Sequence, residues 1–260
     1  MNSADPEHTS ASSWQDPAPA GRPGLPPTVR NLVIVTAAVF LAGHLLGAQF
    51  DRWLALWFPT HPFFAPWQVL TSVFMHGSVA HILFNMIGLV SFGSLLEQRW
   101  GGRRFLIFYL VCGTGAALTH MLAQAVEFQL HWRTLVEAGV PERAIESMLQ
   151  LRMPIPGLPP DLAETAVELY RVYIGRMVGA SGAIYGVLVA FAILYPHVRL
   201  TLLFLPIPIE ARFFIPGLLV IDLLSGVTGF SIFGGGIAHF AHIGGALIGF
   251  LFMLVWRRRA

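Results

Sequence analysis

The sequence predicts an all-α integral membrane protein, folded as a bundle of six transmembrane helices. Of the 260 residues, 55% are hydrophobic and only 12% are charged, whereas about a quarter of the residues in an average soluble protein are charged. The hydrophobic residues also lie in long blocks, and a helix needs roughly 20 mostly apolar residues to cross a bilayer. Six blocks have this character, of which the second and fifth are short: 32–50, 79–96, 105–126, 177–195, 213–226 and 237–256.

The segments around these blocks define the expected domain organisation. Residues 1–29 are rich in Pro, Ser, Ala and Gly, which is typical of disorder, and we expect a disordered cytoplasmic tail. Residues 30–256 form the membrane domain, and residues 257–260 form a short basic cytoplasmic tail. Between the third and fourth blocks, segment 127–176 is expected to be an extracytoplasmic insertion. Its prolines predict two short amphipathic helices joined by the turn PIPGLPP.

The arginines predict how the chain is oriented in the bilayer. Basic residues concentrate in the cytoplasmic loops of membrane proteins, and all 16 basic residues of this chain are arginine. With the N-terminus inside, the short outer loops hold only Arg52, and ten arginines lie on the inner side: Arg22, Arg30, Arg99, Arg103, Arg104, Arg199, Arg212, Arg257, Arg258 and Arg259. We therefore expect both termini in the cytoplasm and the protein in a bacterial inner (plasma) membrane. The net charge of +2 gives no indication of a nucleic-acid partner.

Four polar residues inside the hydrophobic blocks need an explanation, because polar groups in a membrane core are costly and mark function. They are His81 and Asn85 in HILFN, Ser181 in GASG and His242 in AHFAHIGG. Each lies within about two turns of the outer end of its block, which is within roughly 10 Å of the outer surface. Three separate segments therefore place a serine, two imidazoles and an amide at one depth.

These residue types form a complete set for nucleophilic catalysis. A serine hydroxyl attacks only when a neighbouring base takes its proton, and imidazole is suited to that task. An asparagine amide, a histidine N–H and a backbone N–H can stabilise the resulting oxyanion. Asp222, in the fifth block, is the only acidic residue that could orient His242. Because it lies nearer the middle of its block, we expect a Ser181–His242 dyad with no third member.

Alternatives exist for the individual residues. A serine in a membrane helix commonly bonds to its own backbone, so Ser181 alone would favour packing. His239 and His242 could bind a metal with His76 and His81, but no carboxylate or cysteine accompanies them, and we expect no metal and no cofactor. We assign no function to four further histidines taken singly: His44, His76, His120 and His197.

The glycines near the proposed dyad indicate close helix packing. Gly182-x-x-x-Gly186 and Gly245-x-x-x-Gly249 each place small residues on one helix face, and such faces allow two membrane helices to approach closely. If the two faces meet, the fourth and sixth spans pack just below Ser181 and His242. Gly179, two residues before the serine, is expected to keep bulk away from the nucleophile.

HILFN, GASGAIYG and AHFAHIGG, in this order on the second, fourth and sixth blocks, resemble the motifs of the rhomboid family of intramembrane serine proteases. The resemblance covers about residues 30–256. It implies a six-helix fold with a short, central serine helix and an active site open to the outer aqueous side. It also implies that Ser181 is the nucleophile, that His242 is the base, and that His81, Asn85 and the Ser181 backbone N–H form the oxyanion hole.

The resemblance extends to supporting features. Tyr185 matches the aromatic residue on which the family's catalytic histidine stacks. Loop 51–78 matches the membrane-embedded first loop, and the fifth span matches the substrate gate. Some members have Trp-Arg in the first loop, where this chain has Trp67-Gln68, so a role for that arginine does not transfer. His239 occupies a position that varies in the family.

The expected function follows from the resemblance and the polar set together. We expect an intramembrane serine endopeptidase that works in the lipid bilayer and cleaves single-pass transmembrane proteins near the outer end of their helix. The alternative is a non-catalytic protein of the same fold that binds transmembrane clients. Such family members typically lack the serine or the histidine, and both are present here.

Overall fold

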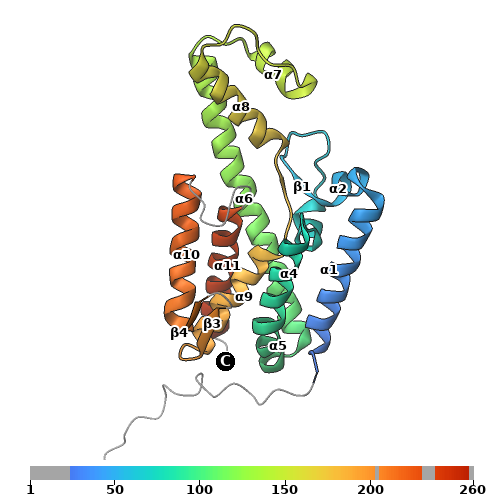
Figure 1. Cartoon of the computed structure of the whole chain (residues 1–260), viewed down its shortest axis with the longest axis vertical. Coiled ribbons are helices and arrows are strands. Elements are labelled where there is room, and N and C mark those ends of the chain that lie inside the picture. The colour runs from blue at the N-terminus through green and yellow to red at the C-terminus, as the bar shows by residue number, and fades with distance from the viewer. Residues whose placement is uncertain (1–23, 203–204, 230–237, 258–260) are drawn as a thin grey trace, which may run out of the picture.

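The structure, a computed structural model, describes residues 24–202, 205–229 and 238–257. The tails 1–23 and 258–260, and with them most of the expected disordered segment, lie outside the described residues. The membrane part is a helical bundle (Figure 1). Its spans are α1 (Pro27–Leu46), a composite of α4 (Val79–Gly88), π-helix η2 (Leu89–Gly93) and α5 (Ser94–Trp100), then α6 (Gly102–Glu137), α9 (Ser181–Leu194), α10 (Ala211–Thr228) and α11 (His239–Arg257).

The predicted bundle of six helices is confirmed. Five of the described segments are long and apolar enough to cross a membrane, and α9 is a shorter apolar helix of 14 residues. The short fifth block forms α10, and the segment before it has a different structure. That segment forms an antiparallel hairpin of β3 (Arg199–Leu202) and β4 (Leu205–Glu210), and α10 begins directly afterwards.

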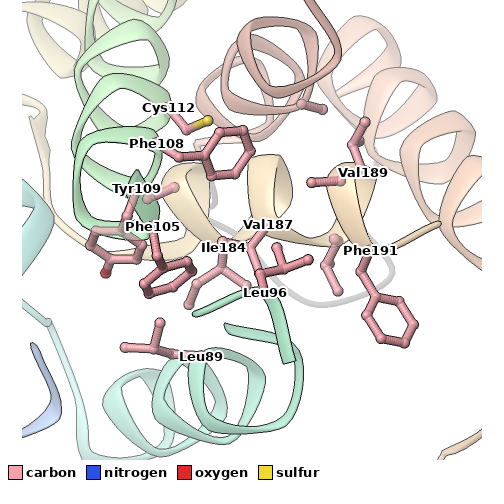
Figure 2. Close-up of a cluster of buried hydrophobic side chains, with 14 of the residues drawn as sticks. Leu89, Leu96, Phe105, Phe108, Tyr109, Cys112, Ile184, Val187, Val189 and Phe191 are labelled. Atoms are coloured by element: carbon pink, nitrogen blue, oxygen red, sulfur yellow. The ribbon is translucent and has the colours of Figure 1, made fainter. Parts of the chain in front are cut away.

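Helix α9 lies in the centre of the bundle. Ten of its 14 residues are buried, whereas at most 39% of any longer span is buried. Figure 2 shows its side chains among those of α6 and the second span, including Leu89, Leu96, Phe105, Phe108 and Tyr109. Lipid is as apolar as these side chains, so hydrophobicity alone does not select the central helix. The central helix is selected instead by small residues, which permit close contact with its neighbours.

The contact between α9 and α11 is made at glycines, as the sequence predicts. A Cβ atom added to Gly245 would overlap the carbonyl oxygen of Gly182, and one added to Gly249 would lie 2.7 Å from Gly186 Cα. A Cβ atom on Gly186 would also come within 2.5 Å of the Cys112 sulfur on α6. The two glycine faces therefore meet, and backbone packs directly on backbone.

The outer loops hold the segment that leads into α9. After α2 (Ala48–Leu54), strand β1 (Leu56–Trp57) pairs antiparallel with β2 (Arg176–Met177), just before the serine. An Arg176–Asp51 ion pair of 2.8 Å joins the same two segments. The first loop continues through α3 (Gln68–Thr71) and η1 (Ser72–Phe74) to the start of α4.

The first loop is ordered around one amide, that of Gln68. Its side chain is fully buried, and Nε2 donates to the carbonyl oxygens of Arg52 at 2.9 Å and Phe63 at 2.7 Å. Oε1 accepts from the backbone N–H groups of Ala65 at 3.1 Å and Trp57 at 3.4 Å. A neutral amide thus stabilises the loop at the position where some family members have arginine.

The insertion between the third and fourth spans contains two helices, α7 (Glu142–Leu151) and α8 (Pro160–Ile174). Its first part differs from the expectation, because α6 continues without a break to Glu137 (Figure 1). The extension of α6 packs on α8 around a separate apolar core that includes Phe58, Phe128, Leu135, Ile145 and Leu169. The amphipathic sequence is therefore stabilised by its own small core. Its extracytoplasmic side stays a prediction.

The glycine contact can be tested with Gly245→Ala. The added methyl group meets the backbone of α9, which cannot move away alone, and we expect the unfolding free energy to fall by about 1–3 kcal/mol. Gly217→Ala on α10 is the matched control, because its Cβ atom would meet nothing within 4 Å. Unfolding of both variants in mixed micelles measures the difference. Equal stability of the two would contradict the close contact.

Candidate active site

Ser181 is the first residue of α9 and lies in the wall of a cavity of about 880 Å³. The cavity is also lined by His81 from α4, His120 from α6 and His242 from α11. Because Ser181 opens the helix, its backbone N–H has no carbonyl partner within α9 and is free to donate to a ligand. A helix N-terminus also favours negative charge. This position suits an oxyanion.

The predicted pair of Ser181 and His242 is in contact. The serine Oγ lies 2.7 Å from His242 Nε2, which is the length of a good hydrogen bond. The Tyr185 ring stacks on the imidazole, with the ring centroids 4.2 Å apart and the planes 11° from parallel. Stacking limits rotation of the imidazole and keeps Nε2 directed at the serine.

Asp222, which we did not expect to reach the site, is also in contact with the histidine. Its Oδ2 lies 3.1 Å from His242 Nδ1, and the residue is buried. The expectation rested on a position nearer the middle of the block, but α10 ends at Thr228, six residues after Asp222. Asp222 is therefore only about 9 Å below the outer end of its helix, at the depth of the other polar residues.

The Asp222 carboxylate has two further partners. Oδ1 lies 2.5 Å from His239 Nδ1, and Oδ2 accepts from the Tyr185 hydroxyl. Among the described residues, Asp222, His239 and His242 are the one group whose ligand atoms are close enough to hold a metal. This set differs from the four-histidine alternative, and hydrogen bonds already engage each of its ligand atoms.

The two expected oxyanion donors differ in position. His81 lines the cavity, and its Nδ1 accepts from the Gly77 N–H at 3.5 Å, so its Nε2 can carry the proton. Asn85 is buried, and its amide donates to the His81 carbonyl oxygen at 2.8 Å. As described, the cavity wall includes His81 but not Asn85.

The supporting glycines have distinct roles. Gly179 has a φ of +131°, and a Cβ atom there would lie 2.8 Å from His81 Cε1 and Nε2 but 3.7 Å from the Ser181 Oγ. The expectation that it clears space for the nucleophile is therefore refined, since the ring it accommodates is that of His81. Gly182 packs against Ala116 of α6 and against the carbonyl oxygen of Ala241.

His76 belongs to the site, although the sequence alone gives it no role. Its Nε2 accepts from the backbone N–H of Ala180, next to the serine, at 3.5 Å, and Nδ1 lies 3.4 Å from the Phe74 carbonyl oxygen. Burial, with a smaller contribution from neighbouring His81, lowers the pKa of His76 to about 4. The neutral ring can thus accept a hydrogen bond at neutral pH. No periodic pattern reveals a contact made from a loop.

Comparison with known proteins agrees with the motifs. The family described as "Rhomboid domain" matches residues 64–138 and 160–259, which leaves out the stretch that contains α7. A mitochondrial rhomboid protein of Schizosaccharomyces pombe, described as uncharacterized, is 27% identical, with 85% of this chain and 57% of that protein aligned. The chloroplastic Rhomboid-like protein 16 of Arabidopsis thaliana is 27% identical, with 76% of this chain and 54% of that protein aligned.

A shorter similarity involves a relative named as a protease. The Rhomboid protease GluP of Bacillus subtilis is 40% identical over 47 residues, which are 18% of this chain and 9% of that protein. The chain spans little more than half the length of the yeast and plant relatives above.

Gly179→Ala tests the packing of His81 against the chain. The substitution adds strain at positive φ, of order 1–3 kcal/mol, and a collision with the His81 ring. We expect labelling of Ser181 by a fluorophosphonate to slow at least tenfold, where ~1.4 kcal/mol corresponds to a factor of ten. Gly157→Ala is the control, because it has a φ of +74° but open space. Unchanged labelling of the Gly179 variant would contradict this assignment.

The pKa of His76 predicts a pH dependence of stability. A folded-state pKa of about 4 against an ordinary value near 6.5 means that the unfolded chain binds the proton more tightly. The lowered pKa of His76 therefore contributes to the unfolding free energy fully above pH 6.5. This contribution is lost as the pH falls, by up to about 2 kcal/mol between pH 7 and pH 5. His76→Gln, which keeps an acceptor, should reduce this slope of unfolding free energy with pH. Identical slopes would refute the prediction.

Proposed function

The chain belongs to the rhomboid family, and on that premise we propose that it is an intramembrane serine endopeptidase. Its substrates are single-pass transmembrane proteins, cut near the outer membrane face. One observation carries the proposal: Ser181 Oγ and His242 Nε2 lie 2.7 Å apart in the wall of a cavity of about 880 Å³. The two residues are 61 positions apart in the chain.

The first half of the proposed reaction forms an acyl-enzyme. Ser181 Oγ bonds to the scissile carbonyl carbon while its proton moves to His242 Nε2. The Ser181 backbone N–H and His81 donate to the carbonyl oxygen as it becomes an oxyanion. When the C–N bond breaks, the leaving amine takes the proton from His242. The products are an ester on Ser181 and a released amine fragment.

The second half hydrolyses the ester. A water molecule enters the cavity and gives a proton to His242 Nε2 as its oxygen attacks the acyl carbon. The ester C–O bond then breaks, and Ser181 Oγ recovers the proton while the carboxylic acid fragment leaves. The polar groups of the cavity wall, among them His120 and Gln124, provide an environment in which water is retained.

The proposed substrate class follows from where the cavity lies. Ser181 is the first residue of its helix, and we place that end of the helix toward the outer side of the membrane. A peptide bond close to the end of a transmembrane segment then reaches it first. A helical peptide bond is shielded by its own hydrogen bonds, so helix-weakening residues should favour cleavage. Clients bound but not cut would instead fit the non-catalytic alternative.

For the cellular membrane that contains the protein, we propose only which side the cavity faces. The apolar helices support an integral membrane protein. The yeast and plant relatives are named mitochondrial and chloroplastic, so they give the expected bacterial plasma membrane no support. We propose that the cavity opens on the side of the membrane opposite the termini.

Ser181→Ala and His242→Ala test the function directly. Each removes one of the two reacting groups, the hydroxyl or the imidazole. We expect cleavage of a reporter transmembrane substrate in liposomes to fall by about 10³-fold or more. Labelling of Ser181 by a fluorophosphonate should require His242. Ser147→Ala and His131→Ala are matched controls outside the cavity and should cleave normally. A well-folded wild-type protein that is never labelled would favour client binding over proteolysis.

A further inference from the structure

The outer half of α10 is attached to the bundle through a carboxylate. Four residues of this helix are buried, and Ala211 and Ile215 lie in its inner half. The other two are Asp222 and Ser225. Most large apolar side chains around them are exposed, including Val220 at 56% and Leu224 at 57%. A buried charge in a membrane helix is costly unless it is paired, so Asp222 calls for a functional explanation.

All three partners of this carboxylate are hydrogen-bond donors. They are the Tyr185 hydroxyl on α9 and the Nδ1 atoms of His239 and His242 on α11. An ionised carboxylate can only accept, so the contact with His242 requires a proton on Nδ1. The other nitrogen of a neutral imidazole then lacks a proton, and Nε2 is left to accept from Ser181.

We propose that Asp222 is a positioning residue that completes a Ser181–His242–Asp222 triad, rather than a dyad, and that it ties the reactive state of the site to the docking of α10. The proposal rests on the proposed function. The carboxylate selects the tautomer in which His242 can take the serine proton, and it stabilises the imidazolium formed during each half-reaction. His239 and Tyr185 hold the carboxylate in place.

The location of the acid on α10 adds a consequence. Nucleophile and base lie on α9 and α11, which pack glycine against glycine, whereas the acid lies on a more exposed helix. Gly226 lets α10 approach, since a Cβ atom there would be 3.1 Å from His239 Cβ. Movement of the outer end of α10 away from α11 would remove the acceptor from His242. Reactivity of Ser181 therefore depends on α10 being docked during the chemical steps.

Asp222→Asn in the full-length protein tests the triad, because asparagine keeps the shape but its amide can donate to His242 Nδ1. That favours the wrong tautomer, and comparable changes lower turnover by about 10⁴-fold. We expect labelling by a fluorophosphonate, a small probe that needs no transmembrane segment, to slow by at least about 100-fold. For a transmembrane reporter in liposomes, kcat should fall similarly and KM should change less than about twofold. Asp161→Asn, an exposed carboxylate on α8, is the matched control.

Nitrogen-15 NMR of labelled histidine supplies a second readout that a structural role would not move. Wild-type His242 should carry its proton on Nδ1, and the Asp222→Asn variant should carry it on Nε2. Asp222→Glu, which keeps a carboxylate, should recover part of the labelling rate. If the asparagine variant does not fold, the wild-type spectrum still decides, because a proton on Nε2 there overturns the proposal.

The remaining outcomes separate the competing explanations. Labelling of Asp222→Asn at the wild-type rate overturns the triad. If labelling is intact but KM for the transmembrane reporter rises, the carboxylate only holds α10 in place, and the proposal is wrong. If wild-type protein is not labelled at all, the proposed function fails instead, and the NMR measurement still tests the tautomer independently.

Discussion

The backbone contact between α9 and α11 is the constraint on which the site depends. Gly182 follows Ser181 directly, and Gly245 comes three residues after His242, so the place where the helices touch lies beside the reactive pair. In lipid, helices gain little from burying apolar surface against one another, and close packing decides which faces meet. A side chain at either glycine would separate the helices and, with them, the hydroxyl from the imidazole.

Around this contact, the polar groups of the site bond to partners from elsewhere in the chain. The serine has the histidine, the histidine has Asp222, and the backbone before the serine is bonded by His76 and by the Ser72 carbonyl. Such bonds are electrostatically stronger in the low dielectric of a protein interior than in water. They order a region that would otherwise be an irregular loop next to a helix end.

The sequence was sufficient to predict the spans, the serine–histidine pair, the stacked Tyr185 and the glycine faces, because each leaves a pattern with a fixed period or motif. Contacts between a loop or helix and a distant partner leave no such pattern. The contact of Asp222 with His242 was missed because it joins two helices that meet only in the folded chain, and no motif or period encodes it. His76 makes its contact from a loop. The continuation of α6 into segment 127–176 was missed because the segment is acidic, and this part of the helix is stabilised by packing on α8.

Because α6 is unbroken, the distance along its axis from the level of Ser181 to its far end is fixed. Ala116 packs beside Gly182 at the level of the serine, and the helix continues to Glu137, a rise of about 30 Å at ~1.5 Å per residue. Helix α7 lies at the far end of this extension, and α8 runs back from it toward the bundle (Figure 1). A polypeptide that touched α7 while one of its bonds lay at Ser181 would have to bridge that height with roughly nine or ten extended residues. The chain thus contains a built-in spacing between its outermost helices and its nucleophile.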